Sequence, residues 1–127
     1  MTDNERRVRA AELMGWTNIR CERTDVMKYL NYGEPILIGD YVVDGATTVT
    51  KPIRDYPHDM NAAMEVIAAT SNIRWAMHQL DDGKTWTAYT MKQEGRGWKN
   101  VSDAQDELLS RAITDAFIKA MCNQNGE

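Results

Sequence analysis

Cysteine is almost absent from this chain of 127 residues, which contains only Cys21 and Cys122. The two lie far apart in the sequence. Neither belongs to a Cys-x-x-Cys motif or to the Cys/His spacing that is typical of zinc sites. We therefore expect two free thiols in a reducing cytosol, with no metal ion and no cofactor bound to the protein.

Long apolar runs are also missing. The first ten residues, MTDNERRVRA, contain no apolar segment of the kind found in signal peptides. Further along the chain, no stretch approaches the roughly 20 apolar residues that span a membrane. We expect a protein that stays in the cytoplasm of the cell that makes it and has no membrane partner.

An excess of positive charge is the third absence. The chain has 15 Lys and Arg against 19 Asp and Glu, which gives a net charge of −4. Binding to bulk DNA, RNA or an anionic membrane needs many uncompensated cations. The charge therefore disfavours these partners, whereas a small polyanion is still possible because two or three arginines in one pocket suffice.

Catalytic signatures are missing as well. The sequence contains no phosphate-binding GxxxxGK[ST] loop and no GxGxxG, GxSxG or HExxH motif. Cys21 has no evident base nearby. Asp55 and Asp59 could form a carboxylate pair, but carboxylates close to a helix start are mostly caps. These absences predict that the protein is not an enzyme.

What the sequence does contain is the composition of a globular protein. Hydrophobic residues make up 43% and charged residues 27% of the chain. A chain of this length buries roughly two thirds of its unfolded surface, which is enough for one core. Since no repeat or linker interrupts it, we predict a single domain over 1–127 with a frayed tail at 123–127.

Three helices are predicted. Thr2 and Glu5 form a capping box that opens a helix over 3–14, and Gly15 is placed to end it. A second helix is predicted over 58–70. A third is predicted over 103–122, opened by a second capping box at Ser102. Both later helices have apolar residues at helical spacing: Met60, Ala63, Met64, Ile67 and Ala68 in the second, and Leu109, Ala112, Ile113, Ala116, Phe117 and Ala120 in the third.

Two hairpins complete the predicted fold. Asp44-Gly45 indicates a turn within 35–50, although the rest of 17–57 has a weak pattern. Asp82-Gly83 indicates a second hairpin in which Leu80 pairs with Thr85. The order of helices and strands predicts an α+β fold, a small and largely antiparallel sheet sandwiched by helices.

The register of the second hairpin assigns its side chains to two faces. Trp75 and Trp86 share one face with Met77, Ala88 and Thr90, and aromatic residues placed in this way usually pack in a core. Tyr89 lies on the opposite face, together with Arg74 and His78.

The segment Gly95–Asn100, with the sequence GRGWKN, follows this hairpin. We predict a short loop that leads into the last helix. It brings Arg96, Trp98 and Lys99 close together, so it is either a recognition loop for an anionic ligand or a turn with solvated charges.

The segments DYPHDMNAAMEVI and LLSRAITDAFIKA, together with the Trp-bearing hairpin between them, resemble the phage α-β-α sandwich domain family. The resemblance covers about 5–16 and 55–121, and residues 17–54 show no such pattern. It departs at Met64, where the family often has Trp. The matching positions are Met14 to Trp16, Tyr56, Asp59, Ala62 to Val66, and Arg111 to Ile113.

The resemblance implies a small phage protein that acts in the cytoplasm of an infected bacterial host. Similar small phage proteins include Thoeris anti-defence sponges, which hold cyclic ADP-ribose isomers or cyclic nucleotides without cleaving them. By this resemblance we expect a homo-oligomer whose subunits share each binding site. At the matching motif position, Arg111 is the residue expected to reach the ligand.

The remaining candidate ligand residues come from chemistry, since a nucleotide needs aromatic platforms, amides or carboxylates, and arginines. They are Tyr89, Trp98, Arg96, Lys99, Asn100, Asp115, Trp86 and Arg54. Structural alternatives stay open for several of them. Arg111 could pair with Asp115 at i+4. Arg54 could belong to a capping cluster with Asp55 and Asp59.

One side of the last helix carries Arg111 and Asp115 among apolar residues, namely Leu108, Ile118 and Cys122. A solvated side would not normally combine these residues, so we predict that this mixed side contacts another subunit. Three functions follow for the protein: a non-catalytic nucleotide sponge, a module that docks on a host protein through an exposed helix face, or a small hydrolase.

Overall fold

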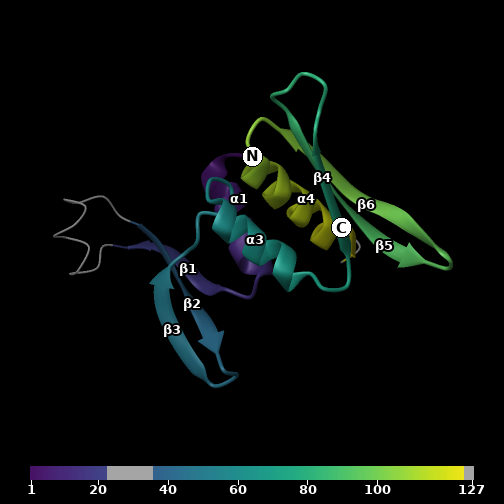
Figure 1. Ribbon diagram of the computed structural model, residues 1–127. Coiled ribbons are helices and arrows are strands. Elements are labelled where there is room, and N and C mark those ends of the chain that lie inside the picture. Colours follow the sequence, from purple (N-terminus) through teal and green to yellow (C-terminus); the bar gives the residue numbers. More distant parts are fainter. Residues whose placement is uncertain (23–35, 125–127) are drawn as a thin grey trace. The chain divides into compact units, whose positions relative to one another are not determined.

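The computed structural model describes residues 1–22 and 36–124, and it divides the chain into two compact units. One unit comprises Met1–Met14 and Arg54–Glu127, and the other comprises Gly15–Ile53. Each unit contains one three-stranded antiparallel sheet (Figure 1). Helices and antiparallel sheets together confirm the predicted α+β class, and the single-domain organisation stays a prediction.

The smaller unit is a meander of β1 (Thr17–Glu22), β2 (Ile36–Val43) and β3 (Thr47–Pro52). The predicted Asp44-Gly45 turn is confirmed, with φ of 53° and 73° at these two residues. Trp16 is buried, because Gly39 has no side chain and lets the indole lie against the strand backbone.

The larger unit contains the helices α1 (Asp3–Leu13), α3 (Met60–Ala69) and α4 (Leu109–Gln124). Thr2 caps α1 by accepting the N–H of Glu5, and Gly15 follows the helix with a φ of 99°, as both signals predicted. Asp59 caps α3 by accepting the N–H of Asn61. Fraying was predicted for 123–127. The helix α4 extends to Gln124, and residues 125–127 lie outside the described residues.

The sheet of this unit has the order β4 (Arg74–Gln79), β5 (Trp86–Glu94) and β6 (Gly97–Asp106). The predicted register of β4 and β5 is confirmed, since Gln79 pairs with Trp86 and the N–H of Leu80 donates to the carbonyl of Thr85 at 2.8 Å. Trp75 packs against the core as expected, and its indole N–H donates to Thr70 at 2.7 Å.

The prediction for the segment after β5 was wrong. GRGWKN is no loop into a helix: Gly95 and Arg96 form a two-residue turn, and β6 begins at Gly97. Gly95 has a φ of 61°, as a type II′ hairpin turn requires at its first central position. The polar residues of β6 have low strand propensity, which β5 overrides by offering a long edge to pair with.

Ser102 is accordingly a strand residue and does not cap the last helix, which begins at Leu109 instead of 103. It is buried in β6, where its hydroxyl lies 2.6 Å from that of Thr90 and donates to the carbonyl of Ala116 at 2.8 Å. This chain of hydrogen bonds connects β5, β6 and α4.

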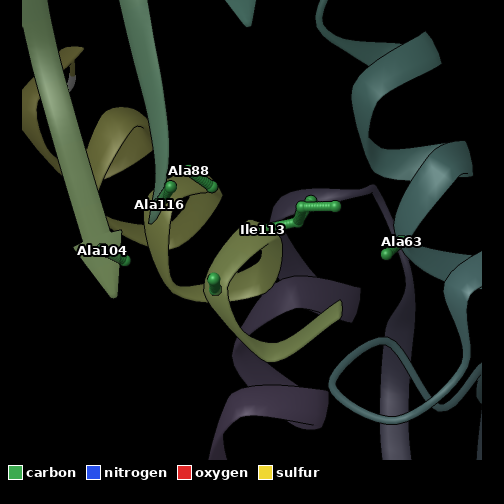
Figure 2. Close-up of a cluster of buried hydrophobic side chains, with 6 residues drawn as sticks. Ala63, Ala88, Ala104, Ile113 and Ala116 are labelled. Carbon is green, nitrogen blue, oxygen red and sulfur yellow. The ribbon is translucent and has the colours of Figure 1, made fainter. Parts of the chain in front are cut away.

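The core of the larger unit lies where α4 packs between α3 and the sheet, and small side chains form most of it. Figure 2 shows Ala88 of β5 and Ala104 of β6 close to Ala116 of α4, with Ile113 directed toward Ala63 of α3. Alanines allow the backbones to approach closely. The apolar stripe predicted for α4 is confirmed, since Ala112, Ile113, Ala116, Phe117 and Ala120 are all buried.

The stripe predicted for α3 was partly wrong. The helix buries Ala62, Ala63 and Val66, whereas Met60 and Met64 are 40% and 50% exposed. The buried side is thus rotated toward the small residues, because alanines fit closer against α4 than methionines do. Two methionines one turn apart are left on the surface of the helix.

Candidate functional site

The sheet of the larger unit has one face packed by α4 and one face that we call the open face. Directly paired residues lie on the same face of a sheet. Ala76 pairs with Tyr89 and Tyr89 pairs with Asp103, so the side chains of these three residues, one from each strand, share the open face. The open face therefore carries a row of polar and aromatic side chains: Arg74, His78, Tyr89, Trp98, Asn100, Asp103 and Gln105.

The far end of the β5–β6 hairpin runs past the helices, as Figure 1 shows, and we call residues 92–100 the arm. Every residue of the arm is exposed. Its charged side chains are Lys92, Glu94, Arg96 and Lys99, so cations predominate here in a chain whose net charge is −4. The arm is a local positive surface.

Trp98 is the most unusual residue of the arm, because 48% of its surface is exposed to solvent. The guanidinium carbon of Arg74 lies 5.3 Å from the centre of its ring. Register explains the contact: Arg74 pairs with Met91, and Trp98 pairs with Gln93 two residues further along β5. Arg74 and Trp98 form a cation–π pair, and about half of the surface of Trp98 is still exposed.

Tyr89 holds a second aromatic position on the open face. Its ring lies edge-on to that of His78, with the two centres 5.9 Å apart and an angle of 75° between the planes. Tyr89 is half-buried and Asp103 lies beside it on β6. An aromatic ring, an imidazole and a carboxylate thus lie together at the centre of the sheet.

The structure separates the other residues predicted for the arm. Asn100 pairs with Met91 and shares the open face with Trp98. Lys99 pairs with Lys92 on the opposite face, where its amino group lies 3.8 Å from a carboxylate oxygen of Glu94. Arg96 lies in the turn at the tip. The predicted cluster is therefore spread over both faces of the arm.

Arg111 lies away from this surface and binds carboxylates of its own chain. Its Nε and Nη2 donate to the two carboxylate oxygens of Asp3, each at 2.9 Å, and its Nη1 donates to Asp106 at 3.0 Å. A two-point arginine–carboxylate contact of this kind holds both groups in a fixed orientation. The contacts give Arg111 a structural role, and its ligand role stays a prediction.

Asp3 is the centre of this charged network. Besides Arg111, it accepts from Arg6 at 2.9 Å, and the Nε2 of His58 lies 2.8 Å from it. Hydrogen bonds from Arg111, followed by the positive charges around the carboxylate, lower the pKa of Asp3 to about 2 in spite of partial desolvation. The side chain is therefore ionised at neutral pH.

Asp115 does not pair with Arg111 at i+4, because it accepts a hydrogen bond from the Nε of Arg6 at 2.7 Å. That contact crosses from α1 to α4. Asp3 and Asp115 compensate the two arginines, so the network connects the helices and offers no excess of positive charge to an anion.

Within the single chain, α1 packs against the mixed side of α4, for which we predicted contact with another subunit. Ile118 is 7% exposed within the single chain, and the thiol of Cys122 lies 3.6 Å from Nη2 of Arg9. Leu108, before the helix begins, is 36% exposed. The combination of apolar and charged residues on this side reflects contact with a partner helix of the same chain. The expected homo-oligomer stays a prediction without this support.

Arg54 and Trp86 also lie away from the open face. An Nη2 of Arg54 lies 2.9 Å from Glu65 and 4.0 Å from the capping carboxylate of Asp59, which favours the structural alternative for this arginine. Trp86 pairs with Gln79 and Asp106 on the face that packs against α4, and it is half-buried.

A scan against protein-family models matched no family, and searches of curated proteins and of solved structures matched no protein and no structure. Among the described residues, no helix has the length and apolar character needed to cross a membrane. In the same part of the chain, no group of three or more histidine, cysteine or acidic side chains is placed to hold a metal ion.

Sequence reasoning missed Arg74 as a candidate ligand residue. The signal was available, because the hairpin register had already put Arg74 on the same face as Tyr89. What could not be foreseen was that β6 would add Trp98 to that face. The open face combines an exposed indole, a guanidinium, an amide and a carboxylate, which suits binding to bases and phosphates.

Proposed function

We propose that the protein binds a small phosphorylated nucleotide on the open face and the arm, and that it holds the nucleotide without cleaving it. The observation that carries the proposal is Trp98, which is 48% exposed and paired with Arg74 at 5.3 Å. Large exposed indoles cost free energy in water, and a base stacked on the ring removes that cost.

Each part of a nucleotide finds a chemical partner on this surface. A base stacks on the exposed part of Trp98, and the guanidinium of Arg74, which lies over the ring, binds a phosphate through two parallel hydrogen bonds. Asn100, on the same face, offers an amide to a base or a ribose hydroxyl. Arg96 at the tip adds a positive charge that attracts a phosphate.

In the setting that the sequence resemblance suggests, the ligand is a cyclic nucleotide signal of bacterial immunity and the protein is a phage anti-defence sponge. Retention without hydrolysis accords with the chemistry of the open face. Its side chains offer stacking and hydrogen bonds, and the ring of His78 lies edge-on to that of Tyr89.

The test is to incubate the purified protein with cyclic ADP-ribose isomers, cyclic dinucleotides and cyclic trinucleotides. The unbound nucleotide is quantified, and the protein is then heat-denatured and the released nucleotide is identified by chromatography. Depletion followed by release of the intact compound is expected. Release of an altered compound would show an enzyme, and no depletion of any compound would refute nucleotide binding.

Two substitutions locate the site. Trp98→Ala and Arg74→Ala should each weaken binding by about tenfold or more, since base stacking and a charged two-point contact each contribute on the order of 1–3 kcal/mol. Lys84→Ala is the matched control for charge, because Lys84 is an exposed cation in the β4–β5 turn, at the other end of the sheet. Equal affinity in Arg74→Ala and Lys84→Ala would remove the open face from the site.

A second candidate function is favoured by a different observation. Met60 and Met64 are exposed one turn apart on α3, and exposed Ala68 continues their row. Such a row suits docking on another protein through an exposed helix face. The same assay separates the two functions, because a docking module depletes none of the nucleotides.

A further inference from the structure

The open face has two aromatic positions, Trp98 and Tyr89, and the distance between them decides whether one base can contact both. Trp98 lies opposite Gln93, which is four residues beyond Tyr89 in β5. With about 3.3 Å per residue, the two positions are roughly 13 Å apart along the sheet. Stacked or edge-on rings lie about 4.5–7 Å apart, so one base in contact with the exposed part of Trp98 does not also contact Tyr89.

Arg74 lies between the two aromatic positions. It pairs with Met91, midway between Tyr89 and Gln93 in β5, and its guanidinium already extends toward Trp98. The order along the open face is therefore aromatic ring, cation, aromatic ring. A nucleotide in which phosphate joins two nucleosides has the complementary order of base, phosphate, base.

We infer that the ligand belongs to the class of dinucleotides, linear or cyclic, with one base on Trp98, the other on Tyr89 and the bridging phosphate on Arg74. The inference rests on the proposed function and adds to it the number of bases. Asp103, which pairs with Tyr89, then accepts a hydrogen bond from an amino or imino group of the second base.

The charges on the open face limit how many phosphates the ligand can have. A longer single strand would place further phosphates on the open face, where Asp103 is negative and Arg74 and His78 are the basic side chains of β4. The remaining cations of the arm are Lys92 and Lys99 on its opposite face and Arg96 at its tip. The open face accordingly suits one or two phosphates better than a chain of them.

The first experiment varies the ligand and leaves the protein unchanged. Calorimetry measures the affinities of AMP, the linear dinucleotide pApA, its analogue without the second base, cyclic di-AMP and a ten-residue oligoadenylate. We expect at least one of the two complete dinucleotides to bind about tenfold or more tightly than AMP and the abasic analogue, because each stacked base adds its own contribution.

The outcomes separate this inference from the proposed function. If AMP or the abasic analogue binds as tightly as both dinucleotides, the two-base class is wrong while nucleotide binding stands. If no compound binds, both are wrong. An oligoadenylate that binds far more tightly than either dinucleotide would overturn the inference in favour of single-stranded nucleic acid.

The second experiment assigns the two bases to the two rings. Tyr89→Leu keeps an apolar side chain in the strand, and it should weaken dinucleotide binding by about tenfold but AMP binding by less, because AMP has one base and Trp98 can still hold it. Trp98→Ala should weaken both. If Tyr89→Leu leaves dinucleotide affinity unchanged in a protein whose circular dichroism and melting temperature match the wild type, Tyr89 holds no base and the inference fails.

Discussion

At the scale of single residues, the side chains of Asp3 and Trp98 show how differently a polar contact can be used. Asp3 accepts from two arginines and lies within hydrogen-bonding distance of His58. Its negative charge is therefore compensated by side chains of the same chain. Trp98 has one cationic partner and remains 48% exposed. Arginines alone do not locate a site, because Arg111, which we expected to reach a ligand, binds carboxylates of its own chain.

The lowered pKa of Asp3 gives a prediction at this scale. Because the pKa is about 2 in the folded protein against 3.8 as reference, the folded state gains stability above pH 3.8 and loses it as the pH falls toward 2. Asp3→Asn should lower the free energy of unfolding at pH 7 by about 1 kcal/mol, a value reduced for solvent screening of a partly exposed group.

Urea unfolding of the wild type and Asp3→Asn between pH 7 and pH 2 measures this difference, which should shrink below pH 3.8. Asp81→Asn is the control, since Asp81 is an exposed aspartate of the β4–β5 turn. A difference between wild type and Asp3→Asn that is the same at pH 2 and pH 7 would contradict an ionic role for Asp3.

At the scale of elements, the sequence predicted structure well where the signal is local. The cap at Thr2, the glycine after α1 and the Asp82-Gly83 hairpin each depend on a few adjacent residues, and all are confirmed. β6 has no such signal, because Asn100, Ser102 and Asp103 have low strand propensity and pair only because β5 lies beside them.

The candidate site depended on that missing strand. Tyr89, Trp98 and Asn100 were nominated from their chemistry, and the structure places them on one face. Lys99 was nominated with them but lies on the other face, since neighbouring residues of a strand point to opposite sides. A loop has no such alternation, so the wrong element gave a wrong cluster.

The turn of the arm gives a prediction for this element. Gly95 has a φ of 61°, a conformation that costs a residue with a Cβ about 1 kcal/mol or more. Gly95→Ala should therefore raise the hydrogen-exchange rates of amides in residues 92–100 and leave those of α4 unchanged. It should also weaken nucleotide binding, because Trp98 is then held less firmly.

Gly97→Ala is the matched control for the arm. Gly97 lies on the other side of the turn, and its φ is not positive. A Cβ added there meets no atom within 4 Å. The substitution should change exchange in the arm little. Equal exchange in the two variants would mean that the turn conformation does not hold the hairpin together.

At the scale of the whole molecule, the larger unit depends on close packing of α4 against both α3 and the sheet. The cluster that joins them consists of Ile113 and five alanines, namely Ala63, Ala88, Ala104, Ala112 and Ala116 (Figure 2). Alanines contribute little buried area each, so their role is to let the layers approach. This arrangement also keeps one face of the sheet packed against α4.

Enlarging one of these alanines should consequently destabilise the unit as a whole. Ala88 is 0% exposed and lies on β5 against α4. Ala88→Leu inserts three carbon atoms at a fully buried position, and overpacking of this kind typically costs about 1–3 kcal/mol. We expect the melting temperature to fall by several degrees, measured by circular dichroism, because a chain of this size loses roughly 2–8 °C per kcal/mol.

Ala68→Leu makes the same chemical change on the exposed side of α3. There the larger side chain extends into solvent, and leucine has nearly the helix propensity of alanine, so the melting temperature should stay within about 1–2 °C of the wild type. If the Ala88→Leu and Ala68→Leu variants have the same melting temperature, close packing of the sheet against α4 does not contribute to stability. The alanine cluster would then not be what holds the sheet on the helices.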